Sequence, residues 1–257
     1  MTRWTAILIM VIALPARADE LVENLTLAGI QEFIAAYQAW DGNRFGAAAE
    51  LFRQATTNAP GSATNFYWLG AAQFHRMLQL QSLPASRTNA LAATAAMDAA
   101  LAALTTSVKL DPRHAESHAL LGALYGMKID GNLLRGARFG PRVAKHRQQA
   151  LEFGPQNPRV VYLLGMCQFH TAKKPAAHRE ALASLLAAEK IFTAEAQRTL
   201  GPLEPRWGHS SCLTFIGRTY ELLGRRPEAA DYYRRALAAH PADHLAREGL
   251  ARVSANT

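Results

Sequence analysis

Cysteine is scarce in this chain: Cys167 and Cys212 are the only two among 257 residues. A disulfide framework of the kind that holds small secreted domains together is therefore excluded, and the fold must depend on packing. Two buried free thiols are the expected state, and a single disulfide between them is the alternative.

Motifs that carry catalysis or bind cofactors are also lacking. Residues 131–136 lack the Lys-Ser/Thr ending of a phosphate-binding loop, and the serines at 210–211 do not stand in a complete G-x-S-x-G nucleophile elbow. His114 and His118 are spaced for a shared metal, but Glu116 does not directly follow the first histidine, as the zincin motif requires. A packed imidazole is the simpler interpretation of His118. We predict no enzymatic activity, no metal site and no cofactor.

Long runs of one charge are absent as well, although Lys and Arg outnumber Asp and Glu by 28 to 20. Without four consecutive basic residues, a nucleic-acid-binding arm is not indicated. The basic excess gathers in one segment whose lone acid is Asp130, and this basic patch comprises Lys128, Arg135, Arg138, Arg142, Lys145 and Arg147. Such a patch could attract acidic proteins, anionic lipid headgroups or a phosphorylated ligand. A solvated helix face is the alternative.

No apolar run reaches the length of about 20 residues that crosses a bilayer. The chain instead begins with a positive charge at Arg3, an apolar run from Trp4 to Leu14, and the small-x-small sequence at 16–18. This pattern is typical of a secretory signal peptide. We predict cleavage after residue 18 and export of residues 19–257 to the periplasm or the medium, and an uncleaved anchor is the alternative.

What the sequence does contain is a repeat. The segment from Leu213 to Pro241 places large apolar, glycine, tyrosine and alanine residues at fixed offsets, namely Leu213, Ile216, Gly217, Tyr220, Ala229, Tyr233, Ala236 and Pro241. The small residues let two antiparallel helices approach closely, and the tyrosines fill the space beside them. Proline ends the second helix. This is the pattern of a tetratricopeptide repeat (TPR), and one such unit predicts neighbours because it cannot bury its apolar face alone.

Further units follow in the same phase. We predict repeats at about 29–62, 63–114, 115–157, 158–209 and 210–243, with a capping helix at 244–253. The spacing of the closing prolines indicates insertions at about 76–94, at 126–142 and within 171–209, which we expect to emerge as loops. The predicted fold is an all-α, right-handed TPR-like solenoid of about five helix pairs. An alanine-rich helical bundle is the alternative.

The first helices of a TPR array line its concave face. The repeat register places mainly aromatic residues there: Phe33, Tyr37, Trp40, Tyr67, Phe74, His75, Tyr162, Met166, Phe169 and His170. Exposed apolar surface usually marks a binding site, so we predict non-catalytic binding of a peptide, protein or apolar ligand in this groove. The structural alternative is that the insertions bury these rings as core. The functional alternatives are an accessory role in periplasmic solute transport and an envelope-assembly scaffold acting through the basic patch.

Four short segments resemble a group of exported bacterial TPR proteins. They are Tyr125-Gly126-Met127-Lys128, Gly140-Pro141-Arg142-Val143, Asn157-Pro158-Arg159-Val160 and Pro205-Arg206-Trp207-Gly208. The resemblance implies an exported helical-repeat scaffold and no catalytic activity. Where that group has a Phe-Phe-Gly segment, this chain has Gln168-Phe169-His170-Thr171, so a ligand tied to that segment is not implied here.

Overall fold

The computed structural model describes residues 13–255, and their side chains from residue 18 onward. Most of the predicted signal peptide, residues 1–12, lies outside the described residues. The described part forms α-helices and no strand. The helices are α1 (Ala13–Ala39), α2 (Gly42–Asn58), α3 (Ala63–Ser82), α4 (Arg87–Leu110), α5 (Ala115–Ile129), α6 (Leu133–Phe153), α7 (Pro158–Thr171), α8 (Pro175–Glu195), α9 (His209–Leu222), α10 (Arg226–Ala239) and α11 (His244–Ser254).

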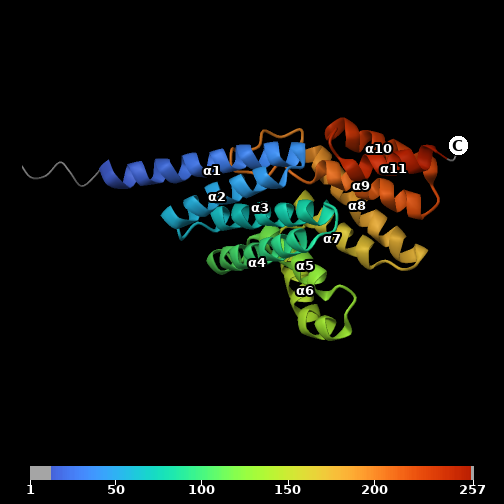
Figure 1. Ribbon diagram of the computed structural model, residues 1–257, viewed down its shortest axis with the longest axis horizontal. Helices are drawn as coiled ribbons and strands as arrows, with labels where there is room; N and C mark the ends of the chain where they lie inside the picture. Colours follow the sequence, from blue (N-terminus) through green and yellow to red (C-terminus); the bar gives the residue numbers. More distant parts are fainter. Residues whose placement is uncertain (1–12, 256–257) are drawn as a thin grey trace, which may run out of the picture.

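Consecutive helices pack as pairs, from α1 with α2 to α9 with α10, and α11 packs on the last pair. Figure 1 shows the pairs following one another from the blue N-terminal end to the red C-terminal end. The predicted all-α solenoid of about five helix pairs with a C-terminal capping helix is therefore confirmed.

Short polar side chains set the starts of several helices. Asp41 accepts a hydrogen bond from the backbone N–H of Asn43 at 2.8 Å, which satisfies one of the unpaired donors in the first turn of α2. Asn157 caps α7 in the same way, and Pro158 follows at a position where no intrahelical donor is needed. These local signals mark where the helices begin independently of tertiary contacts.

The insertions differ from the expectation that they would emerge as loops. The first two instead lengthen helices: α3 and α4 have 20 and 24 residues, and α6 has 21. Extending an existing helix adds a hydrogen bond for each residue without a new nucleation step, and the alanine-rich sequence of α4 favours this. A long irregular segment remains only in the third insertion, at 196–208.

Of the helices in the described residues, α4 alone is long and apolar enough to cross a membrane. Its apolar character comes largely from alanine, and Ala96, Ala100 and Leu104 are buried against the solenoid. A core helix of a soluble protein passes the same test, so a single such helix is weak evidence of a membrane span.

Glycines in the first helices allow close approach of the second helices. A Cβ added at Gly70 would lie 2.5 Å from Leu104 Cγ on α4, and one at Gly217 would lie 2.9 Å from the Tyr233 ring on α10. Real Cβ atoms essentially never come this close to a neighbour, so the helix pairs would have to separate.

We expect Gly217→Ala to destabilise the protein by about 1–3 kcal/mol, because the buried Tyr233 ring has no free space to move into. The matched control is Gly126→Ala on α5, where nothing lies within 4 Å of the added Cβ. That substitution should be neutral or stabilising, since alanine favours helix over glycine. Urea denaturation followed by circular dichroism measures both, and equal effects would contradict the packing argument.

Candidate functional site

The residues predicted to line an open aromatic groove do converge, but most of them are buried. The buried ones are Phe33, Tyr67, Phe74, His75, Tyr162, Met166 and Phe169, whereas Tyr37 and Trp40 are half-buried and His170 is exposed. The prediction of an open groove lined by these rings is therefore wrong. The rings form part of the core of the solenoid.

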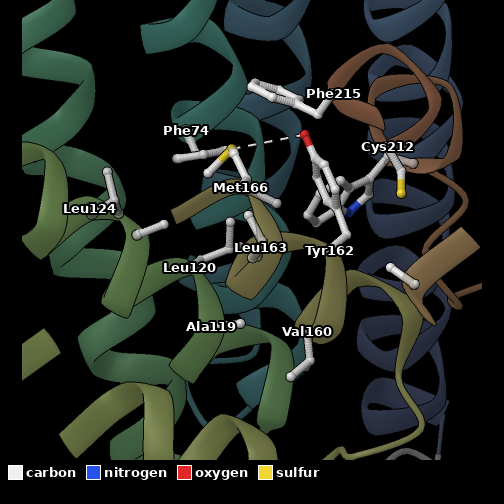
Figure 2. Close-up of a cluster of buried hydrophobic side chains, with 14 of the residues drawn as sticks. Phe74, Ala119, Leu120, Leu124, Val160, Tyr162, Leu163, Met166, Cys212 and Phe215 are labelled. Atoms are coloured by element: carbon white, nitrogen blue, oxygen red, sulfur yellow. Dashed lines mark hydrogen bonds between the residues drawn. The ribbon is translucent and has the colours of Figure 1, made fainter. Parts of the chain in front are cut away.

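The rings are buried because the first helices of successive pairs meet along their inner faces. Phe33 of α1 contacts Trp68 of α3 with ring centroids 5.3 Å apart. Further along the array, Phe74 of α3 lies in one cluster with Tyr162 and Met166 of α7, as Figure 2 shows. Inner faces that interdigitate in this way form core and leave no aromatic channel.

The two ends of the solenoid also touch each other. The Tyr37 hydroxyl of α1 lies 2.6 Å from the Ser211 hydroxyl of α9, and its ring stacks on His240 with centroids 5.6 Å apart. The ring nitrogen Nε2 of His240 lies 2.8 Å from the backbone oxygen of Gln38. Tyr37 thus joins the first repeat to the last.

The irregular segment 196–208, here named the strap, lies against the inner ends of the first helices. Trp68 Nε1 donates a hydrogen bond to the Leu203 carbonyl at 3.2 Å, and Trp207 Nε1 donates to the Tyr67 hydroxyl at 3.0 Å. The Trp207 side chain is 2% exposed and lies edge-on to His75, with centroids 4.9 Å apart. In Figure 1 the strap is the orange loop that connects α8 to α9 along the chain.

A buried charge network anchors the strap. Arg159, which is 3% exposed, donates from Nε to Glu116 at 2.8 Å and from Nη2 to Glu195 at 2.5 Å. Its Nη1 also donates to the Trp207 carbonyl at 3.4 Å. The Tyr67 hydroxyl donates to the other oxygen of Glu116. One guanidinium therefore ties α5, α7, α8 and the strap together.

The electrostatics of this network keep each group in the form that its hydrogen bonds require. Burial raises the pKa of Tyr67 well above its usual value, and the charge of Glu116 raises it further, so the phenol stays protonated and donates. Burial lowers the pKa of Arg159, but the two carboxylates outweigh it and raise the pKa overall. Burial lowers the pKa of His75 to about 4, which leaves its ring neutral at pH 7.

A pocket of about 530 Å³ lies beside the network. The N-terminal ends of α3, α5 and α7 form one side and the strap forms the other, and the lining residues are Thr64, Tyr67, His114, Ala115, Glu116, Asn157, Gly201, Pro202, Leu203, Glu204 and Pro205. Burial lowers the pKa of His114, so its imidazole is neutral at pH 7. Glu116 is already bonded to Arg159, Tyr67 and Asn157, and Glu204 accepts a hydrogen bond from the Gly201 backbone N–H at 2.6 Å. The rest of the lining is apolar or uncharged polar surface.

The predicted basic patch lies on the pair α5 and α6, away from this pocket. Lys128 forms an ion pair with Asp98 at 2.9 Å, and Arg135 lies 3.9 Å from Asp130. Arg142 covers the Tyr125 ring at 5.4 Å. The remaining members, Arg138, Lys145 and Arg147, are exposed on α6. Figure 1 shows that this helix pair protrudes from the rest of the solenoid.

The histidine and cysteine side chains considered in the sequence analysis are packed among neighbouring residues. The His118 imidazole is packed: its Nδ1 lies 2.8 Å from His146 Nδ1, and its Nε2 lies 2.9 Å from the Pro112 carbonyl oxygen. Cys167 and Cys212 are both free thiols, and burial raises the pKa of Cys167 to about 11. The described residues contain no group of three or more His, Cys, Asp or Glu side chains that could hold a metal ion.

Of the residues that build the pocket and anchor the strap, the repeat register singled out Tyr67, but it did not single out Glu116, Arg159 or Trp207. Arg159 and Trp207 stood out only as members of short motifs, and Glu116 only as a mismatch to a metal motif. Trp207 is 140 residues from the tyrosine to which it donates. A tryptophan close to two prolines, at 202–207, was the one available signal.

The fold is that of TPR proteins. The chain superposes on TTC0263, a thermophilic TPR protein of Thermus thermophilus, with a TM-score of 0.63, at 20% identity over 91% of this chain and 99% of that one. It also matches Cut9–Hcn1, the APC/C hetero-tetramer, with a TM-score of 0.59, at 16% identity over 95% of this chain and 39% of that one. At these identities the similarity shows the fold alone. A search of the curated proteins finds no match.

A family model places the chain more narrowly. The model described as Regulator of microtubule dynamics protein 1-3 matches residues 34–253, which is most of the sequence. The chain belongs to this family.

Proposed function

We propose that the protein is a non-catalytic interaction scaffold that binds a peptide segment of a partner protein in the pocket between the strap and the helices α3, α5 and α7. The observation that carries the proposal is that this face already holds an irregular segment of the chain, the strap, by its backbone carbonyls. Trp68 and Arg159 donate to the carbonyls of Leu203 and Trp207, as side chains of a peptide-binding groove do.

The size and chemistry of the pocket support the same function. Ligand sites have volumes of roughly 300–1,000 Å³, are mostly apolar, and carry a few polar groups that fix orientation. Here Tyr67, Leu203 and Pro205 supply apolar walls, and Thr64 and His114 supply neutral polar groups. A partner segment with short apolar or prolyl side chains fits such walls better than a charged one, because the Glu116 and Glu204 carboxylates already have partners within the protein.

The family description concerns regulation of microtubule dynamics. From it we carry to this chain only the binding of a protein partner, which the pocket supports. A role as an accessory of solute transport would use the same pocket for a small molecule. Native mass spectrometry of the purified protein separates the two, since a retained small molecule favours the transport role and an empty pocket favours the peptide role.

Filling the pocket tests the proposal. Peptides selected from a displayed random library on the wild-type protein should lose at least about tenfold in affinity for Thr64→Trp, because the indole occupies the space beside Tyr67. Thr94→Trp is the matched control, since Thr94 is exposed on α4 and does not line the pocket. Peptides that bind both variants as tightly as the wild type, or a library that yields no binders, would contradict the proposal.

We also propose that the protein works outside the cytoplasm after removal of residues 1–18. Exposure of the residues next to the predicted cleavage site supports this: Ala18, Asp19, Glu20 and Leu21 on α1 are exposed, so cleavage there removes little packing. The mature N-terminus, determined by mass spectrometry of the protein from its native cells, should be Asp19. An intact N-terminus in the cytoplasmic fraction would refute the export proposal.

A further inference from the structure

The first turn of α6 carries two adjacent leucines that are almost fully exposed. Leu133 is 88% exposed and Leu134 is 82% exposed, the two highest values among the exposed large hydrophobic residues of the described chain. They begin α6, at the end of a helix pair that protrudes from the solenoid (Figure 1). Two leucines in water at a protruding tip are costly for solubility and usually mark a contact surface.

A stripe of positive charge begins beside these leucines. Arg135, Arg138, Arg142 and Lys145 follow at spacings of three, four and three residues, which places them along one face of α6. Helix α6 has no acidic residue before Glu152. The charges are therefore concentrated on one side of the hairpin.

These cations have little carboxylate compensation. Arg135 reaches Asp130 only at 3.9 Å, with both side chains more than half exposed. Arg138 and Arg142 lie over the Phe139 ring at 5.3 and 5.8 Å, and the structure gives them no carboxylate partner within the described residues. Their charges thus remain available for a partner of opposite sign.

We propose that the α5–α6 hairpin docks on an anionic lipid membrane, with Leu133 and Leu134 inserted among the lipid chains and the α6 cations on the headgroups. The tip protrudes from the solenoid (Figure 1), so it can reach a fluid surface that closes around the leucines. Cations along the helix and aromatic rings between them are the arrangement found in helices that lie at a membrane interface. The surface is separate from the concave pocket, so this docking is independent of peptide binding.

The shape and charge favour lipid over an acidic protein. A protein partner would need a preformed pocket for two adjacent leucines on a protruding tip, and its affinity would depend on that one complementary shape. An anionic bilayer supplies both the apolar layer and the negative charge at any point of its surface. Each cation near such a surface strengthens binding by about fivefold, and the effect falls off within a Debye length.

Co-sedimentation with vesicles tests the proposal. The wild-type protein should bind vesicles of phosphatidylcholine with about 30% phosphatidylglycerol, and binding to pure phosphatidylcholine should be at least about tenfold weaker. Raising the salt from about 50 to about 500 mM should weaken binding to the anionic vesicles strongly. Equal binding to both kinds of vesicle would overturn the proposal.

Two variants, each with a matched control, separate the contribution of leucine insertion to vesicle binding from that of the cations. Leu133→Gln with Leu134→Gln should lower vesicle affinity at least about tenfold, whereas Leu91→Gln with Leu222→Gln, which also changes two exposed leucines, should not. Neutralising Arg135, Arg138 and Arg142 to glutamine should lower affinity by about a hundredfold, whereas neutralising Lys173, Lys174 and Arg179 should lower it far less. All these side chains are exposed, so circular dichroism should show unchanged folding.

Binding to poly-glutamate, which mimics an acidic protein, tests the alternative to membrane docking. If the basic hairpin serves an acidic protein, the wild type should bind poly-glutamate as tightly as anionic vesicles, and the leucine variant should bind both as the wild type does. That result would overturn membrane docking. A loss of vesicle binding confined to the two hairpin variants would establish it.

Discussion

Replacing Arg159 with methionine is expected to lower the free energy of unfolding by about 3–5 kcal/mol. The side chain is 3% exposed and is bonded to two carboxylates, Glu116 and Glu195, so its removal leaves buried negative charge without a counter-ion. The Trp207 carbonyl also loses its guanidinium donor. Methionine fills similar space, so the loss of stability comes mainly from the missing positive charge and not from a cavity. Urea denaturation at pH 7, followed by circular dichroism, measures it.

Arg44→Met is the matched control, because Arg44 also contacts a carboxylate through two nitrogens but lies on the surface. Exposed ion pairs contribute little to stability, so this variant should unfold close to the wild type. Adding Glu116→Gln to Arg159→Met should recover part of the loss by removing one uncompensated charge. An Arg159→Met protein as stable as Arg44→Met would show that the network does not hold the inner face together.

Trp207→Ala should have an effect of similar size, about 3–5 kcal/mol. The substitution opens a cavity between His75 and Tyr67 and removes the hydrogen bond to the Tyr67 hydroxyl. It should also release the strap from the helices. Trypsin should therefore cut after the exposed Arg198 and Arg206 faster in the variant than in the wild type.

The control for this second prediction is Trp40→Ala. Trp40 is half-buried between α1 and α2, and its side-chain partners lie outside the strap, so cleavage of the strap should not accelerate. If trypsin cuts the strap equally fast in the wild type and in Trp207→Ala, then Trp207 does not anchor this segment.

The repeat architecture was predictable because it depends on the spacing of residues that are close together in the sequence. Gly217, Tyr233 and Ala236 mark contacts within one helix pair, and the structure buries all three. The same reasoning overestimated the open concave face. The register assigned Phe33 and Tyr67 to the inner side of the first helices, but it carries no information on whether the inner faces meet or stay apart, and both side chains are buried.

The site could not be predicted, because it depends on contacts between distant segments. Glu116 and Arg159 are 43 residues apart, and the strap reaches back from the fourth repeat to the second. The protruding hairpin could likewise be predicted only in part from the sequence. Its cations were visible in the sequence, but the exposure of Leu133 and Leu134 follows only from where α6 lies.

The central claim is that the inner face of this solenoid holds peptide segments by their backbone: the strap occupies one site on this face, and the adjacent pocket takes a segment of a partner. The most direct test replaces residues 196–208 with a Gly/Ser linker of equal length and adds the missing segment back as a synthetic peptide. The peptide should bind the linker variant saturably and should not bind the wild type, whose own strap fills the site. A linker variant that keeps its helical circular dichroism but does not bind the peptide would contradict the claim.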